Sequence, residues 1–206
     1  MHTNGGPHVK RLAVVYHSIQ GNTEEFARHV LEGAQRISSV DTSLLRAVDL
    51  TSSPERLAAY DGIIWGSPTY FGGVSGPFKS FMDASGYLWR KQGLRGKLAS
   101  GFTVSSLPSG DKLTALLSMF VFSMQHGMIW VGNPGIPEDQ EGVPHEEAAN
   151  RLGSWAGAMG QASHMGPTGA FVPGDLKTAR VFGENFARTL VCYRCNEQRA
   201  AVPALS

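Results

Sequence analysis

Charge, cysteine and long apolar runs are all scarce in this 206-residue chain. Only 17% of its residues are charged, against roughly 25% in a typical globular domain, and the formal net charge is +1. No cluster of Lys and Arg occurs, so we expect no nucleic-acid partner. A chain so close to neutral also supplies no one-signed field that would steer a charged partner.

The longest apolar runs fall short of the roughly 20 residues that a membrane-spanning helix needs, so we expect no membrane partner. Residues 1–9 contain no basic segment followed by an apolar one, which predicts a flexible N-terminus without a signal peptide. The two cysteines, Cys192 and Cys195, are few enough to favour a reducing cytoplasm. No second ligand pair lies near them, so we expect no metal site and a structurally inert pair.

What the chain does contain is a regular alternation of apolar and amphipathic segments. Apolar β-type runs occupy residues 11–16, 43–48, 62–65, 97–105 and 128–131, and helical periodicity occupies residues 23–37, 77–84, 111–125 and 176–195. Five strands separated by helices predict an α/β fold, a doubly wound parallel sheet with helices on both faces. Residues 10–197 are expected to form one domain, followed by a tail at 198–206.

The region from residue 133 to residue 174 interrupts this alternation. It is rich in Gly, Pro, Asn and Ser, and loops of this length within compact domains are usually functional or disordered. We expect a substrate lid or a subunit contact here, with a short helix within residues 148–162.

The segment after the first predicted strand has the pattern of a phosphate-binding loop. The apolar run stops at Ser18, a tight Gly21-Asn22 turn follows, and helical periodicity begins at Thr23. The first N–H groups of a helix lack internal partners and carry the positive end of the helix dipole, which attracts phosphate. The loop has no Lys or Arg, unlike an ATPase P-loop. A plain strand–turn–helix connection with a capping Asn or Thr is the alternative interpretation.

A second loop follows the third predicted strand. Pro68 restricts its backbone, and Thr69 with the amides that follow can hydrogen-bond the polar edge of a planar heterocycle. Tyr70 and Phe71 can cover the face or edge of such a ring. The alternative interpretation is an aromatic turn that packs on the core.

Several blocks of the sequence together resemble one family. The WrbA type of NAD(P)H:quinone oxidoreductase is matched, in order and approximate spacing, by G-S-P-T-Y-F-G (66–72), S-G (75–76), F-M-D (81–83), G-Y-L-W (86–89), L-R-G-K (94–97) and H-G-M (126–128). We assign the broader flavodoxin-like NAD(P)H-dependent oxidoreductase family, which includes NADPH-dependent FMN reductases. The resemblance implies a flavodoxin-like sheet of order 2-1-3-4-5, in which the loops after the first and third strands are neighbours.

The resemblance also implies site residues. The FMN phosphate would be held by Ser18, Ile19, Gln20, Gly21, Asn22 and Thr23. The isoalloxazine ring would be contacted by Pro68, Thr69, Tyr70, Phe71 and Gly72, and on its other side by Ser105, Ser106 and Leu107. The family usually has a Thr/Gly-rich loop at this third position, where this chain continues Leu107-Pro108-Ser109.

Two further residues are implied for the substrate pocket. His126 would lie near the flavin ring as a candidate catalytic residue, and Trp89 would help to roof the site of a neighbouring subunit. A lone His at a helix-to-strand turn is otherwise a hydrogen-bonded structural residue, which remains the alternative for His126.

The function implied is an FMN-dependent enzyme. NADPH or NADH would give a hydride to the flavin, and two electrons would pass on to a quinone or a similar small acceptor. A homodimer or homotetramer is expected. The alternatives are a flavodoxin-type electron shuttle without NAD(P)H activity of its own, and a binding protein that has lost the flavin.

Overall fold

A computed structural model describes residues 9–163 and 170–193 of the chain. The predicted flexible N-terminus, except for its last residue, lies outside the described residues. The same is true of the predicted tail and of Cys195. Cys192 is exposed and forms no disulfide within the described part of the chain.

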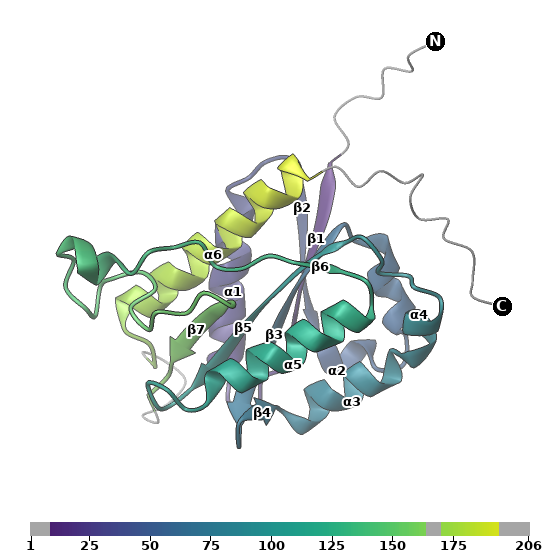
Figure 1. Cartoon of the computed structure of the whole chain (residues 1–206), viewed down its shortest axis with the longest axis horizontal. Coiled ribbons are helices and arrows are strands. Elements are labelled where there is room, and N and C mark those ends of the chain that lie inside the picture. Colours follow the sequence, from purple (N-terminus) through teal and green to yellow (C-terminus); the bar gives the residue numbers. More distant parts are fainter. Residues whose placement is uncertain (1–8, 164–169, 194–206) are drawn as a thin grey trace, which may run out of the picture.

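The centre of the molecule is a parallel sheet, and its strand order confirms the predicted fold class (Figure 1). The order across the sheet is β2 (Val40–Arg46), β1 (Lys10–Tyr16), β3 (Gly62–Tyr70), β5 (Leu98–Ser105) and β6 (Ile129–Trp130). A short strand β4 (Gly73–Val74) folds back antiparallel on the end of β3. Counted along the chain without β4, this is the predicted order 2-1-3-4-5.

The fifth position of the sheet is shared by two short strands. β6 pairs with the beginning of β5, and β7 (Ala158–Gln161) pairs with its end, at Phe102 to Ser105. The predicted short helix within residues 148–162 is therefore wrong at residues 158–161, which form a strand. Gly160 lies so close to Phe26 that a Cβ would approach its ring to 2.7 Å. Small residues fit this close-packed strand, but their low β-propensity does not predict that a strand forms here.

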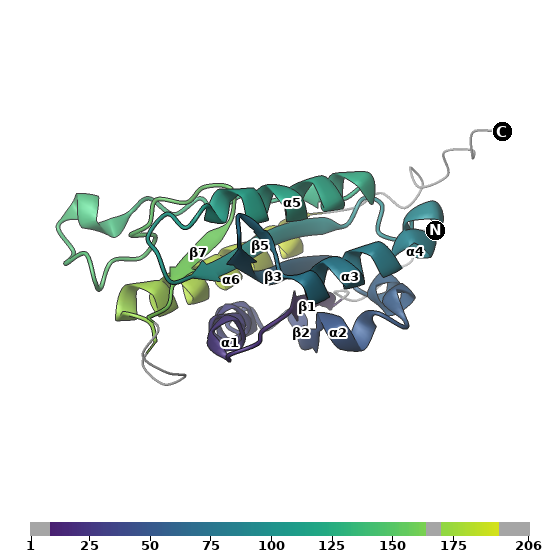
Figure 2. The same cartoon turned by 90° about the horizontal axis from the view of Figure 1, so that it is seen from below.

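Helices cover both faces of the sheet, as Figure 2 shows. The helical segments are α1 (Asn22–Gln35), α2 (Ala47–Leu50), η1 (Pro54–Ala59), α3 (Gly76–Ala84), α4 (Gly86–Arg90), α5 (Lys112–Gln125), η2 (Glu138–Glu141) and α6 (Pro173–Cys192). α1 and α6 contribute to one buried cluster, and α2 to α5 contribute to the other. Each face thus has its own apolar core.

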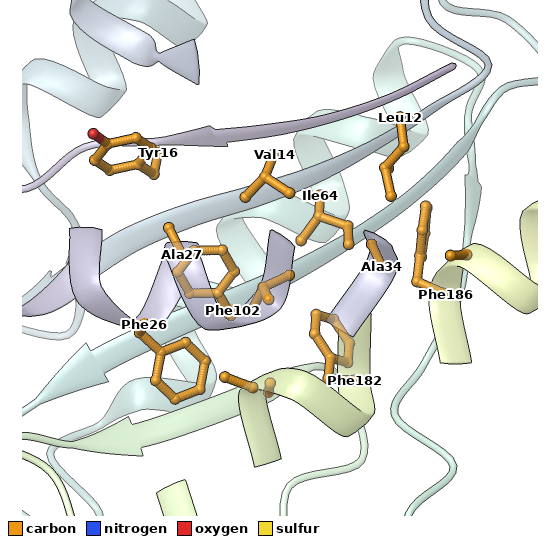
Figure 3. Close-up of a cluster of buried hydrophobic side chains, with 14 of the residues drawn as sticks. Leu12, Val14, Tyr16, Phe26, Ala27, Ala34, Ile64, Phe102, Phe182 and Phe186 are labelled. Carbon is orange, nitrogen blue, oxygen red and sulfur yellow. The ribbon is translucent and has the colours of Figure 1, made fainter. Parts of the chain in front are cut away.

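On the first face, α1 and α6 pack directly against each other and onto the strands (Figure 3). A Cβ on Gly33 would lie 1.9 Å from the carbonyl oxygen of Arg180, and one on Gly183 would lie 1.9 Å from that of Val30. These two glycines let the backbones touch. Phe26 then stacks on Phe102 of the sheet, with ring centroids 5.3 Å apart.

On the second face, α5 packs on the sheet through Leu116 and Met119, which are buried, whereas Leu113 and Leu117 are exposed. The helix is apolar on most sides, so periodicity cannot select the face that meets β5. Among the described residues, no helix combines the length and apolarity needed to cross a bilayer.

Candidate functional site

The first loop of the site joins β1 to α1. Gly21 lies in the left-handed region, with a φ of 93°, and immediately precedes the helix. The N–H group of Gly21 donates to Ser18 Oγ at 3.1 Å, which shapes the turn. No side chain caps the helix, so its first amide N–H groups are available to a ligand.

Side chains in this loop also suit a bound ligand. Asn22 Oδ1 is buried and has no hydrogen-bond partner within the described part of the chain. A buried acceptor without a partner is costly, so a ligand hydroxyl or amide would satisfy it. Among the described residues, no Lys or Arg lines the cleft at this loop, and backbone amides are the groups there that could hold a phosphate. These features fit the phosphate and the hydroxyl-bearing chain of FMN.

The second loop is the tight turn between β3 and β4. Phe71 and Gly72 both have positive φ, 48° and 73°, which turns the chain back on itself. The side chain of Tyr70 is partly exposed and that of Phe71 is fully exposed. Exposed aromatic side chains beside a cleft are typical of a ligand-binding rim.

A buried polar network joins the first loop to the second. His17 Nδ1 lies 2.8 Å from Ser75 Oγ, and the Ser75 N–H group donates to Ser67 Oγ at 3.0 Å. Burial lowers the pKa of His17, so the imidazole is neutral at pH 7. Sequence reasoning missed this network, because His17 lies 58 residues from Ser75 in the chain.

The third loop follows β5 and is held by a buried lysine. Lys112 is fully buried, and its Nζ donates to Ser105 Oγ and to the carbonyl oxygen of Pro108, both at 2.9 Å. It also donates to the carbonyl oxygen of Leu107 at 2.5 Å. Burial lowers the pKa of Lys112 to about 8. The Leu-Pro-Ser sequence that departs from the family pattern is thus anchored by an ammonium group.

The three loops meet at the carboxyl ends of β1, β3 and β5 around a cleft of about 220 Å³. Most of the predicted cofactor-binding residues line it: Ser18, Ile19, Gln20, Asn22, Thr23, Pro68, Thr69, Tyr70, Ser105 and Ser106. Gly21, Phe71, Gly72 and Leu107 lie in the same loops without lining the cleft. Val104, Ala162 and Ser163 line it and were not predicted, since the strand that brings residues 162 and 163 here was taken for a helix.

A second network supports the third loop from the side of β7. Arg151 and Asp175 form a buried ion pair, with Nε and Oδ1 2.8 Å apart. Asp175 Oδ2 accepts the N–H of Gln161 at 2.9 Å, and Gln161 Nε2 donates to the carbonyl oxygen of Ser106 at 3.2 Å. No local sequence signal marks these residues.

His126 does not lie in this cleft within one chain, contrary to the simplest form of the prediction. It follows α5, and the adjacent Gly127 accepts a hydrogen bond from Gly96, just before β5 begins. This is the opposite end of β5 from Ser105. His126 instead lines a separate cavity of about 590 Å³ together with Trp89, the other predicted substrate-pocket residue.

The surroundings of His126 are those of a neutral imidazole. Its Nε2 lies 3.0 Å from Ser85 Oγ, which itself donates to the carbonyl oxygen of Met82 at 2.7 Å. The hydroxyl proton is thereby used, so Nε2–H is the donor and Nδ1 the acceptor. Nδ1 is buried without a partner among the described residues. Burial lowers the pKa of His126 to about 4.

Comparison with known proteins agrees with this geometry. The family of NADPH-dependent FMN reductases matches residues 46–140. The chain is 33% identical to an NAD(P)H dehydrogenase (quinone) of Archaeoglobus fulgidus, over 86% of this chain and 95% of that protein. It is equally 33% identical to flavodoxin FldP of Pseudomonas aeruginosa, over 87% of this chain and 96% of that protein.

A solved structure shows the same architecture. The WrbA-like protein from Agrobacterium tumefaciens superposes with a TM-score of 0.70 at 31% identity, covering 90% of this chain and 99% of its own. Fold, site geometry and sequence thus agree. The chain belongs to the flavodoxin-like NAD(P)H-dependent oxidoreductase family and is an NAD(P)H-dependent flavin oxidoreductase.

Proposed function

We propose that the three-loop cleft binds FMN and that the protein passes electrons from NAD(P)H through this flavin to a quinone. The observation that carries the proposal is the convergence of the three loops at the switch point between β1 and β3. Ligands of doubly wound sheets bind at this place. An uncapped helix with Gly21 at its start offers backbone amides to a phosphate there.

Each loop has its own part in this proposal. Residues 18–23 hold the phosphate, residues 68–72 contact the isoalloxazine ring, and residues 105–107 lie along its other side. Bound FMN supplies the redox chemistry, accepting a hydride from the nicotinamide and giving two electrons to the acceptor. The chain orients the ring through Lys112 and the His17 network, which fix the loops on either side.

Both substrates would use one open cleft in turn, which predicts ping-pong kinetics. An anaerobic titration of the FMN-loaded protein with NADPH and with NADH, followed by a benzoquinone, tests the proposal. Bleaching of the flavin absorbance by either nucleotide and its recovery with quinone are expected. A flavin that stays oxidised with both nucleotides would refute the proposal.

His126 and Trp89 enter this proposal through a second copy of the chain. Their cavity adjoins exposed apolar side chains on α5, among them Leu117 and Val121, and Trp89 itself is half exposed. We infer a homo-oligomer in which this surface faces the flavin cleft of a neighbour. His126→Ala would then lower quinone reduction more than FMN affinity, and an unchanged quinone rate would remove His126 from the mechanism.

A flavodoxin-type electron shuttle is the second candidate, and the identity with flavodoxin FldP favours it. A shuttle that docks on partner proteins gains from a strongly one-signed surface, which a net charge of +1 does not provide. The same titration separates the two, because a shuttle binds FMN but is not reduced by NADPH or NADH.

A further inference from the structure

A second cavity adjoins the phosphate loop at the carboxyl ends of β1 and β2. Its volume is about 790 Å³, within the range of small-molecule pockets. Ser18 lines both this cavity and the flavin cleft, so the two meet at the loop. The proposed flavin site makes no use of the second cavity.

Three arginines from different elements face this cavity. Arg46 ends β2 and is paired in register with Tyr16, Arg56 comes from η1, and Arg28 lies in the second turn of α1. Burial lowers the pKa of His17, and the charge of Arg46 adds to that lowering, which places its field at the end of β1. Positive charge is therefore gathered beside the first loop.

Two of these arginines are available to a ligand. Arg28 forms an ion pair with Glu24 on the same helix. In the part of the chain that the structure describes, no carboxylate lies within ion-pair distance of Arg46 or Arg56. The cavity wall also includes Asp49, so three guanidinium groups face two carboxylates. The excess is positive in a chain that is otherwise almost neutral.

This chemistry suits a phosphate carried on a nucleoside. Guanidinium groups bind phosphate oxygens through paired N–H donors and stack on planar bases. Half-buried Leu44, which lies on the same face of β2 as Arg46, offers an apolar contact for a base. Rossmann-type NADP sites show that a single arginine near the phosphate loop can accommodate the adenosine 2′-phosphate. Arg46 ends the strand next to β1 and faces the cavity beside that loop here.

We propose that this cavity binds the 2′-phosphate end of NADPH through Arg46 and Arg56, so that NADPH is the preferred donor. The inference rests on the proposed function, since the nicotinamide must reach the flavin while the adenosine lies outside the flavin cleft. A phosphate monoester carries about −1.5 to −2 charges at pH 7, where NADH has only a neutral hydroxyl. Recognition therefore depends on the two free guanidinium groups.

The test is the binding of 2′,5′-ADP and of 5′-AMP to the FMN-loaded protein by calorimetry, at one fixed ionic strength. We expect 2′,5′-ADP to bind at least tenfold more tightly. Arg46→Ala and Arg56→Ala should each weaken 2′,5′-ADP about tenfold, the loss expected for a charge-assisted hydrogen bond, with 5′-AMP unchanged. Arg36→Ala is the matched control, because Arg36 lies at the far end of α1 and pairs with Glu184.

Steady-state kinetics give an independent readout. Arg46→Ala should lower kcat/KM for NADPH about tenfold while kcat/KM for NADH stays within twofold, and the NADPH effect should shrink as salt rises. Equal affinity for 2′,5′-ADP and 5′-AMP, or equal loss with both nucleotides, would overturn the inference. A different result would refute the proposed function, namely a bound flavin that neither nucleotide reduces. In that case the 2′,5′-ADP measurement still decides whether the cavity recognises the phosphate.

Discussion

Removing the Lys112 ammonium should change how the stability of the protein depends on pH. Lys112 is fully buried and its pKa falls from 10.5 to about 8, chiefly because burial disfavours the charged form. In the unfolded chain the pKa returns to its usual value. Between about pH 8 and pH 10.5 the unfolded chain therefore binds more protons at this position than the native one. Native stability must rise with pH across this window.

The size of the effect follows from the shift. Each unit of pKa corresponds to about 1.4 kcal/mol, so Lys112 should add about 3 kcal/mol to the free energy of unfolding across the window. Lys112→Met keeps the apolar stem and removes the titration. At pH 7 the variant loses the hydrogen bonds to Leu107 and Pro108 but also a buried charge. The pH dependence is therefore the sharper measurement.

The assay is urea unfolding of the wild type and of Lys112→Met, followed by tryptophan fluorescence at pH 7, 8, 9 and 10. The free energy of unfolding of the wild type should rise relative to that of the variant, with most of the change complete by pH 10. Other groups that titrate in this window cancel in the difference. A difference that stays constant within about 0.5 kcal/mol would refute the reasoning, because it would mean that Lys112 is solvated in the native state.

Three other predictions concern stability. His126 has a pKa of about 4 in the native state, so the unfolded chain takes up its proton first as pH falls from 6.5 to 4. Over this range the free energy of unfolding of the wild type should fall by about 3 kcal/mol relative to that of His126→Gln. A difference between the two proteins that is the same at both pH values would contradict this. Arg151→Met leaves the carboxylate of Asp175 buried and unpaired and should lower stability by about 3–5 kcal/mol in urea unfolding, whereas a loss below about 1 kcal/mol would mean that water replaces the pair. Gly183→Ala forces a Cβ against the backbone of α1 and should cost about 1–3 kcal/mol, measured by thermal unfolding beside Gly86→Ala, whose added Cβ meets nothing within 4 Å.

Much of the fold could be predicted because its signals are local. The apolar runs that became β1, β3 and β5 predict buried parallel strands, and the start of α1 is marked by the turn at Gly21. The turn at residues 18–23 could be predicted for the same reason. The groups proposed to bind the phosphate are backbone amides, which any chain presents once a helix begins at that point.

The supports of the site could not be predicted in this way. In the sequence, Lys112 is a polar residue in the first turn of a predicted helix, and only the packing of α5 on β5 buries it beside Ser105. The ion pair between Arg151 and Asp175 joins positions 24 residues apart through β7, whose small residues carry little β-propensity. Contacts of this kind depend on how distant segments close on each other, and no local period encodes them.

The class of fold and the first two loops of the proposed site could be inferred from the residues alone, because strand and helix periods and helix-terminal amides are properties of short segments. The third loop was implied only by the family resemblance. The tertiary structure alone decided which face of α5 is buried. It also placed β7 in the sheet, joined Ser18 to a cavity lined by Arg46 and Arg56, and put His126 at the end of β5 away from the cleft. These outcomes follow from the packing of segments far apart in the chain. The burial of a side chain and the charges around it there depend on neighbours that the local sequence does not specify.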